Sequence, residues 1–345
     1  MNQGRRLAIA APRREGARVM SGFASFLRRS LAAAAVLAAS AHSPAKAEPL
    51  EVRLDYAYYN PVSLVLKDKH WVEEALGPDV HVTWVLSAGS NKALEFLNAQ
   101  SLDFGSTAGA AALLGRANGN PIKAVYVYSK PEWTALVTRS DSPIKTVADL
   151  KGKRVAVTRG TDPHIFLLRA LAGAGLTEHD IKIVPLQHAD GRLALDRGDV
   201  DAWSGLDPFM AQAELENHDR LFFRNADLNT YGVLNVREAF LAAHADVVEK
   251  VIAAYERGRH FALDHKAELA QVLATAAKLS PEVAARQLER TDLSSPVLGD
   301  GPRQSIKAAA AVLKSSGVVD ASVDLDQVLA QLLEPRFSQK YASAQ

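Results

Sequence analysis

From residue 50 onward, the chain alternates between two patterns of apolar and polar positions. Short runs such as 52–56 place apolar residues at every second position, which is typical of strands. The next run, 61–76, keeps its apolar residues three or four positions apart until Gly77 and Pro78, which predicts a helix that ends there. Strand and helix patterns then repeat, so we expect an α/β fold with mainly parallel sheets and flanking helices.

The same two patterns give the remaining elements. The runs expected to form strands are 51–56, 80–86, 102–106, 122–129, 133–139, 154–160, 181–187, 200–205 and 231–236. Helical patterns separate most of these runs. After the last of them the chain turns helical from Arg237 to His265, and again after Pro281, Gln304 and Leu325.

The length and the order of the elements predict two lobes. About 300 residues exceed one comfortable hydrophobic core, and the strand–helix pattern restarts after Pro143. The late helices need a sheet to cover, so we expect the chain to return to the first lobe through a hinge of two crossing strands near Trp133 and Tyr231. We therefore assign lobe 1 to 48–131 and 235–345, and lobe 2 to 132–234.

The first 47 residues have the layout of an export signal. A basic pair at 28–29 precedes an apolar run at 31–39, and Ala45-Lys46-Ala47 matches an A-x-A cleavage site. The apolar run is too short to span a bilayer. We expect export to the periplasm with cleavage after Ala47 and with Met20 as an alternative start, while Sec and twin-arginine export both stay open.

Removal of this segment changes the charge of the protein. Residues 1–47 carry a net +7 and the whole chain carries +1, so the remainder carries −6. A mildly acidic protein does not favour a nucleic-acid partner. With no cysteine there is no disulfide, thiol nucleophile or zinc–thiolate site, and the common hydrolase, P-loop, dinucleotide and zinc-protease motifs do not occur. We expect a soluble monomeric binding protein without cofactor or metal.

Three Asn-Pro or Asp-Pro pairs lie where a strand pattern changes to a helical one. Asn or Asp before a helix caps its free N–H groups, and Pro at the next position loses nothing because that N–H has no partner. Several helix starts at the carboxyl ends of strands would form an anion site. A capping carboxylate repels an anion, so Asp162 and Asp207 fit a cap, a contact between lobes, or a partner for a ligand's amino group. The pairs are Asn60-Pro61, Asp162-Pro163 and Asp207-Pro208.

Three further turns place small or hydroxyl residues between a strand and a helix. Their backbone N–H and hydroxyl groups can approach an oxyanion closely, and each hydrogen bond to a charged group contributes about 1.5–3 kcal/mol. One such turn alone is equally an ordinary N-cap, but repetition on both lobes favours a shared anion site. The turns contain Ser87, Gly89 and Ser90; Ser106 and Thr107; and Gly160 and Thr161.

Single residues near these turns could complete the site. Tyr59 and Asn60 would provide a polar aromatic edge. Trp203 could face an alkyl chain or lie in the core. His164 and His188 follow strands at positions where a ligand can sit, although a surface or capping histidine is the commoner outcome.

Three segments carry a resemblance to a known family. The segments "NAQSLDFGSTAGAAALL", "TVADLKGKRVAVTRGTDPHIFLLRALAGAGL" and "LALDRGDVDAWSGLDPFMAQAE" resemble the exported solute-binding proteins of ABC importers for aliphatic sulfonates, taurine and nitrate. The resemblance implies a two-lobed type II periplasmic-binding fold that closes on its ligand. Leu206 and Phe209 depart from the family, which often has a second aromatic around the Asp-Pro. The ligand-facing residues implied are Tyr59, Asn60, Ser87, Gly89, Ser90, Ser106, Thr107, Gly160, Thr161, Asp162, His164, Trp203 and Asp207.

The resemblance also implies a function. We expect the substrate-binding component of an ABC importer, which captures a small organic anion, foremost an aliphatic sulfonate, and delivers it to a membrane permease and ATPase. Nitrate and a pyrimidine thiamine precursor are the alternative ligands. A pyrimidine-precursor synthase-like enzyme is the weaker alternative, because those enzymes use a Cys-rich motif.

Overall fold

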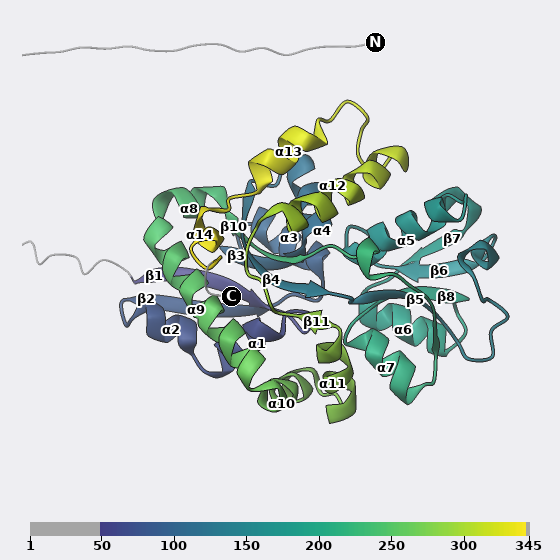
Figure 1. The fold of residues 1–345 in the computed structure, drawn as a ribbon, viewed down its shortest axis with the longest axis horizontal. Coiled ribbons are helices and arrows are strands. Elements are labelled where there is room, and N and C mark those ends of the chain that lie inside the picture. Colours follow the sequence, from purple (N-terminus) through teal and green to yellow (C-terminus); the bar gives the residue numbers. More distant parts are fainter. Residues whose placement is uncertain (1–48, 343–345) are drawn as a thin grey trace, which may run out of the picture. The chain divides into compact units, whose positions relative to one another are not determined.

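The computed structural model describes residues 49–342 of the chain. The expected export signal at 1–47 lies outside these residues. Among the described residues, no helix is both long enough and apolar enough to cross a membrane. The elements form two β-sheets with helices packed against them (Figure 1).

The first sheet has six strands in the order β11-β4-β10-β3-β1-β2. β1 runs parallel to β2 and β3, whereas β10 runs antiparallel to β3 and β4, and β11 runs antiparallel to β4. The bounds are β1 Leu50–Tyr56, β2 Val80–Leu86, β3 Phe104–Ala108, β4 Ile122–Pro131, β10 Gly232–Arg237 and β11 Thr291–Asp292.

The second sheet has five strands in the order β7-β6-β8-β5-β9. β6 runs parallel to β7 and β8, whereas β5 runs antiparallel to β8 and β9. The bounds are β5 Thr134–Thr138, β6 Arg154–Val157, β7 Lys182–Pro185, β8 Ala202–Leu206 and β9 Arg220–Arg224.

Both sheets are mixed, whereas the sequence predicted mainly parallel sheets. In each sheet, a strand that arrives from the other sheet runs against its two neighbours: β10 in the first and β5 in the second. The neighbours of the arriving strand end at the edge where the chain crosses between the sheets. The arriving strand itself starts at that edge, so it runs in the opposite direction. An antiparallel central strand is therefore a consequence of the crossing itself.

Helices cover the faces of the two sheets. In Figure 1, the long α9 lies across the sheet formed by β1, β2 and β3, while α5 and the pair α6 and α7 flank the second sheet. The bounds are α1 Pro61–Asp68, α2 Trp71–Leu76, α3 Ser90–Asn98, α4 Gly109–Ala117, α5 Asp162–Gly173, α6 His188–Asp196, α7 Phe209–Glu216, α8 Glu238–Ala243, α9 Ala245–Asp264, α10 Lys266–Ala277, α11 Pro281–Glu289, α12 Asp300–Ser315, α13 Leu325–Leu332 and α14 Arg336–Gln339.

Each sheet has an apolar cluster on both of its faces. Val52, Leu54 and Phe104 of the first sheet pack with residues of α1 and α9, while its other face packs against α4, α12 and α13. In the second sheet, Val155 packs with α5, and Ala156 packs with α6 and α7. Burial on both faces explains why β5 and β6 are short, nearly continuous apolar runs.

The chain passes between the sheets twice. β4 leads to β5 through Glu132 and Trp133, and β9 leads to β10 through residues 225–231. β10 begins at Gly232 and belongs to the first sheet, whereas the return to lobe 1 was expected at 235. The two crossings are joined by a hydrogen bond from the Thr134 N–H to the Asn229 side chain (3.1 Å).

Candidate functional site

The carboxyl ends of strands from both sheets border a common cavity. Its volume is about 80 Å³. α6 and α7 begin at lining residues, and the turns that lead into α1 and α3 also line the cavity, so the positive ends of helix dipoles lie near it. The lining residues are Tyr58, Tyr59, Leu86, Ser87, Ala88, Gln187, His188, Ala189, Leu206, Asp207, Pro208 and Phe209.

Asn60 caps α1, as the Asn-Pro pair predicted. Its side-chain oxygen accepts a hydrogen bond from the Ser63 N–H (3.3 Å), and Pro61 is the first helical residue. The other end of the same side chain donates from Nδ2 to the Ser106 hydroxyl (2.8 Å). Asn60 is fully buried, so it holds the start of α1 against β3 rather than contacting the cavity.

A buried carboxylate, Asp55, lies behind Asn60 at the end of β1. It accepts hydrogen bonds from the Ser106 N–H and from the Ser106 hydroxyl, each at 2.9 Å. Burial raises the pKa of Asp55 to about 6, and the hydrogen bonds from Ser106 oppose that rise. Because the single proton of the Ser106 hydroxyl points at Asp55, this hydroxyl cannot also donate to an anion.

Three other hydroxyl residues predicted in this region also have structural partners. Thr107 accepts a hydrogen bond from Asn235 Nδ2 (2.8 Å), and Ser90 accepts one from the Ala108 N–H (3.0 Å). The Tyr59 hydroxyl donates to the Ser106 carbonyl (2.9 Å), although the ring still borders the cavity. Ser106 has no proton left for an anion, and neither Ser106 nor Thr107 lines the cavity, because both side chains are buried within the first sheet.

Ser87 and Gly89, from the turn between β2 and α3, lie at the gap between the sheets. Ser87 lines the cavity. A methyl group added to Gly89 would lie 2.9 Å from His188 Nε2, which belongs to the second sheet's α6. Since real Cβ atoms do not approach a neighbour so closely, glycine is required here for the two sides to meet.

His188 begins α6 and is fully buried in the cavity wall. Its Nδ1 lies 3.2 Å from the Thr158 hydroxyl, and that hydroxyl donates its proton to the Leu186 carbonyl (2.7 Å). Among the residues that the structure describes, Nε2 has no hydrogen-bond partner. Burial lowers the pKa of His188 to about 3, so the imidazole is neutral near pH 7.

The turn before α5 does not line the cavity, although the sequence predicted ligand contacts at Gly160, Thr161, Asp162 and His164. Gly160 adopts a positive φ of 75°, and the Thr161 hydroxyl donates to the Thr158 carbonyl (2.6 Å). These residues shape the turn. His164 is not a lining residue; its Nε2 lies 3.9 Å from a Glu178 carboxylate oxygen, and burial lowers its pKa to about 4.

Asp162 is a contact between the sheets rather than a helix cap. Its carboxylate accepts hydrogen bonds from Trp133 Nε1 (2.8 Å), from the Thr230 N–H (2.8 Å) and from the Thr230 hydroxyl (2.7 Å). Trp133 and Thr230 belong to the two chain crossings. The Thr230 hydroxyl in turn accepts from the Ala110 N–H at the start of α4 (3.2 Å), so Asp162 ties α5 to both crossings and, through them, to the first sheet.

Trp203 and Asp207 have different environments despite their closeness in sequence. Trp203 is fully buried in the core between β8, α6 and α7, so the expectation that it faces a ligand is not supported. Asp207 does line the cavity. Its carboxylate accepts from the Ala211 N–H (2.9 Å) and lies 3.4 Å from the guanidinium of Arg290, which follows α11, and burial raises its pKa to about 6.

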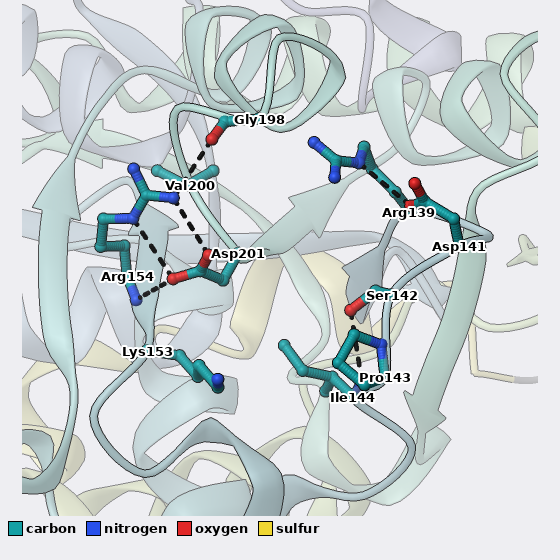
Figure 2. Close-up of a pocket in the computed structure, with 10 residues that line it drawn as sticks. All are labelled: Arg139, Asp141, Ser142, Pro143, Ile144, Lys153, Arg154, Gly198, Val200 and Asp201. Atoms are coloured by element: carbon teal, nitrogen blue, oxygen red, sulfur yellow. Dashed lines mark hydrogen bonds and ion pairs between the residues drawn. The ribbon is translucent and has the colours of Figure 1, made fainter.

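A second and larger hollow, of about 280 Å³, lies at the opposite end of the second sheet. Figure 2 shows Arg154 paired with Asp201, and Arg139 paired with Asp141 across the opening. Lys153 is drawn without a partner. The hollow lies where β6 starts, whereas ligands of open α/β sheets bind beyond the carboxyl ends of strands. The smaller cavity between the sheets is therefore the better candidate site.

Comparison with known proteins places the chain in a family. A family model described as NMT1/THI5 like matches residues 69–269, which is more than half of the chain. The chain belongs to the NMT1/THI5-like family. The resemblance drawn from the three sequence segments is thereby confirmed.

Two curated relatives carry the same functional name. An aliphatic sulfonates-binding protein of Escherichia coli strain K12 is 37% identical over 204 residues, which are 59% of this chain and 64% of that protein. The match therefore spans less than two thirds of the E. coli relative. An aliphatic sulfonates-binding protein of Bacillus subtilis strain 168 is 24% identical over 283 residues, which are 81% of this chain and 85% of that protein.

Solved structures confirm the expected periplasmic-binding fold. The alkanesulfonate-binding protein SsuA from Xanthomonas axonopodis pv. citri, bound to MOPS, aligns with a TM-score of 0.75 and 27% identity over 84% of this chain and 99% of that one. The periplasmic aliphatic sulphonate-binding protein SsuA from E. coli aligns with a TM-score of 0.71 and 28% identity over 83% and 93% of the two chains.

The structure adds site residues that sequence reasoning left out. Asp55 sits within a strand and showed only as a charged residue beside an apolar run. Arg290 lies far along the chain from Asp207, so no sequence pattern links them. His188 was recognised as following a strand but not as a ligand residue, because only the facing turn at Gly89 shows where its ring points.

Proposed function

We propose that this protein captures an aliphatic sulfonate in the cavity between its sheets, as the substrate-binding component of an ABC importer. The observation that carries the proposal is one cavity between the two sheets, lined by the starts of α6 and α7 and by the turns that lead into α1 and α3. The names of the relatives support the sulfonate class. Helix N-termini favour anions because their N–H groups are unsatisfied and their dipoles are positive at that end.

The geometry suggests how an anion would be held. α3 and α6 begin on opposite sides of the gap, at Ser90 and His188, so an anion between them would lie near the positive ends of two helix dipoles. No Lys or Arg side chain is among the lining residues of this cavity. Neutral N–H groups avoid the cost of desolvating a cationic side chain, which suits reversible capture and release. The ligand-facing residues we propose are Tyr59, Ser87, Gly89, His188 and Asp207.

The apolar part of the wall would accept the carbon chain of the ligand. Leu86, Leu206 and Phe209 line the cavity, together with the rings of Tyr58 and Tyr59. Such a surface gains from covering methylene groups, at about 0.8 kcal/mol for each buried CH₂. Nitrate has no carbon to bury, so this wall favours a sulfonate with a short chain over nitrate.

Capture would involve closure of the two sheets about the crossings. Trp133 and Thr230 lie on the two crossing segments and are both held by Asp162. Rotation at such crossings would open and close the cavity without breaking either sheet. Small-angle scattering with and without saturating ligand tests this motion, since a more compact particle is expected with ligand.

The remaining parts of the proposal concern location and partners. A periplasmic relative supports a periplasmic location, which is consistent with the export signal expected at 1–47. A permease and an ATPase outside this chain would take over the ligand after its delivery. Mass spectrometry of the exported protein should show an N-terminus at Glu48, and an intact Met20 terminus would contradict the cleavage prediction.

Calorimetric titration tests the ligand class. We expect binding of ethanesulfonate or 2-aminoethanesulfonate, with nitrate and a pyrimidine thiamine precursor as competitors that fail to displace them. Binding of nitrate or of the pyrimidine in preference to every sulfonate would overturn the sulfonate proposal. A distant structural neighbour is a desulfurization enzyme, but at 16% identity it shows a shared fold alone.

A further inference from the structure

His188 presents an unpartnered hydrogen-bonding atom to the candidate site. The side chain is 1% exposed, and its Nε2 has no partner among residues 49–342. The ring lines the cavity, with Nε2 directed toward Gly89 on the other side of the gap. A buried polar atom without a partner is costly, so a ligand that satisfies this atom gains affinity.

The neighbours of the ring determine which hydrogen-bonding role Nε2 has. The Thr158 hydroxyl has one proton, and it donates that proton to the Leu186 carbonyl. Toward His188 the same hydroxyl can therefore only accept, so Nδ1 carries the imidazole proton. In the neutral ring Nε2 then carries a lone pair and no proton. It accepts hydrogen bonds and cannot donate one to a sulfonate.

The charges around the cavity point in the same direction. Its lining contains one carboxylate, Asp207, and no Lys or Arg. Arg290 approaches Asp207 from behind but also pairs with Glu214, so these three side chains together carry a net negative charge. A ligand that combines an anionic head with a cationic donor matches both the helix N-termini and this acceptor wall.

We propose that His188 is a specificity-determining residue that selects sulfonates with a hydrogen-bond donor on their carbon chain, with an ammonium group preferred. This inference rests on the proposed function and narrows its ligand class to amino- and hydroxyalkanesulfonates. The sulfonate head lies at the N-termini of α3 and α6, and the donor of the chain reaches Nε2 of His188. A site built around such an acceptor rejects an analogue without the donor, because the buried acceptor is left unpaired.

Three ligands of nearly equal length test the selection in the wild-type protein. We expect 2-aminoethanesulfonate to bind about 10- to 100-fold more tightly than ethanesulfonate, since a hydrogen bond from a charged donor has about that effect. The hydroxyl analogue, 2-hydroxyethanesulfonate, should fall between them. Isothermal titration at pH 7 in two buffers of different ionisation enthalpy measures the affinities and any proton taken up.

A matched pair of variants assigns the effect to His188. His188→Phe removes the acceptor but keeps a ring of similar shape, so the ratio of the affinities for 2-aminoethanesulfonate and ethanesulfonate should fall toward one. His164→Phe is the control, because His164 is about as deeply buried as His188 but is not among the residues that line the cavity. It should keep the wild-type preference.

The outcomes separate this inference from the proposed function. Equal or tighter binding of ethanesulfonate by the wild type, or an unchanged preference in His188→Phe, overturns the selection by His188. Proton uptake with ethanesulfonate that is lost in His188→Phe also overturns it, because His188 would then act as a donor. If none of the three sulfonates binds, the proposed function fails and this inference fails with it. Ring nitrogen chemical shifts of His188 need no variant, and they should show the neutral, Nδ1-protonated form with and without 2-aminoethanesulfonate.

Discussion

The two walls of the cavity differ in the residues that stand behind them. Behind the first-sheet wall, the side chains of Asp55, Asn60 and Ser106 hydrogen-bond to one another, so their polar atoms are occupied. In the second-sheet wall, the buried His188 has a ring nitrogen without a partner among the described residues. The layer behind the first wall is therefore a preorganised support, whereas Ser87 Oγ on that wall and His188 Nε2 on the second have hydrogen-bonding capacity to offer a ligand.

The comparison also separates residues of similar chemistry. Asp162 and Asp207 both precede a proline, yet Asp162 is fully used between the chain crossings while Asp207 borders the cavity. An acidic residue before a proline at the end of a strand therefore does not by itself mark a ligand contact. A polar side chain is available to a ligand only if no residue of another helix or strand already hydrogen-bonds to it.

The largest loss of unfolding free energy is expected at Asp162, because its carboxylate accepts three buried hydrogen bonds from the two chain crossings. Asp162→Ala would leave buried donors on Trp133 and Thr230 without an acceptor, with an expected loss of about 3–5 kcal/mol of unfolding free energy. A simple cap would lose only about 0.5–2 kcal/mol. Urea denaturation of the ligand-free protein distinguishes these values, and a loss below about 1 kcal/mol would contradict the role between the crossings.

Replacement of Asp55 should cause the next largest loss of unfolding free energy, and the size of that loss should depend on pH. The folded-state pKa is about 6 and the ordinary value is 3.8, so the folded protein binds a proton that the unfolded chain releases between these values. The contribution of Asp55 to stability is then fully present below about pH 4 and is lost as the pH rises through 6. Asp55→Ala should lose about 2–4 kcal/mol near pH 5 because Ser106 loses its acceptor.

Asp55→Asn isolates the titration, since it keeps an acceptor for Ser106 but cannot ionise. Stability measured from about pH 4 to 8 should fall less steeply in this variant than in the wild type. Burial also raises the pKa values of Asp207 and Asp219 to about 6, so part of the slope should remain. Identical pH profiles for the two proteins would count against a raised Asp55 pKa.

Ser106→Ala tests directly whether the Ser106 hydroxyl stabilises the first sheet or binds the anion. The hydroxyl donates to Asp55 and accepts from Asn60, so its removal should lose about 1–3 kcal/mol of unfolding free energy. Sulfonate affinity, measured by calorimetry on the folded variant, should change less than about threefold, because the hydroxyl is not free to reach the ligand. The reverse result, intact stability with affinity lost, would restore the direct anion contact predicted from the sequence.

The smallest effect is expected at Gly89, where the two walls meet. In Gly89→Ala the new methyl group would lie 2.8 Å from Asn91 Oδ1 and 2.9 Å from His188 Nε2, so both side chains would have to shift at the gap between the sheets. Affinity for a sulfonate should fall about tenfold, equivalent to about 1.4 kcal/mol, with little change in the unfolding free energy. Gly160→Ala is no substitute as a control because of its positive φ, whereas Gly173→Ala meets no neighbour and should bind normally.

Much of the fold followed from local patterns. The strands around Val52 and Val155 and the helix after Asn60 could be predicted, because alternation, helical spacing and an Asn-Pro cap act within a few residues. The antiparallel direction of β5 and β10 could not, because it follows from where each strand enters its sheet. The local sequence indicates which residues form a strand, but it does not indicate which strands lie beside that strand in the sheet.

The sequence by itself determined the family, the α/β fold and the turns at which a ligand site could form. Only the tertiary structure decided which of those turns face the cavity: Gly89 and Asp207 border it or the gap beside it, while Thr107 and Trp203 are used in packing. The physical reason is that a polar side chain becomes available to a ligand only when no other element satisfies or covers it. The partners that do so, such as Asn235 for Thr107, lie more than a hundred residues away in the chain.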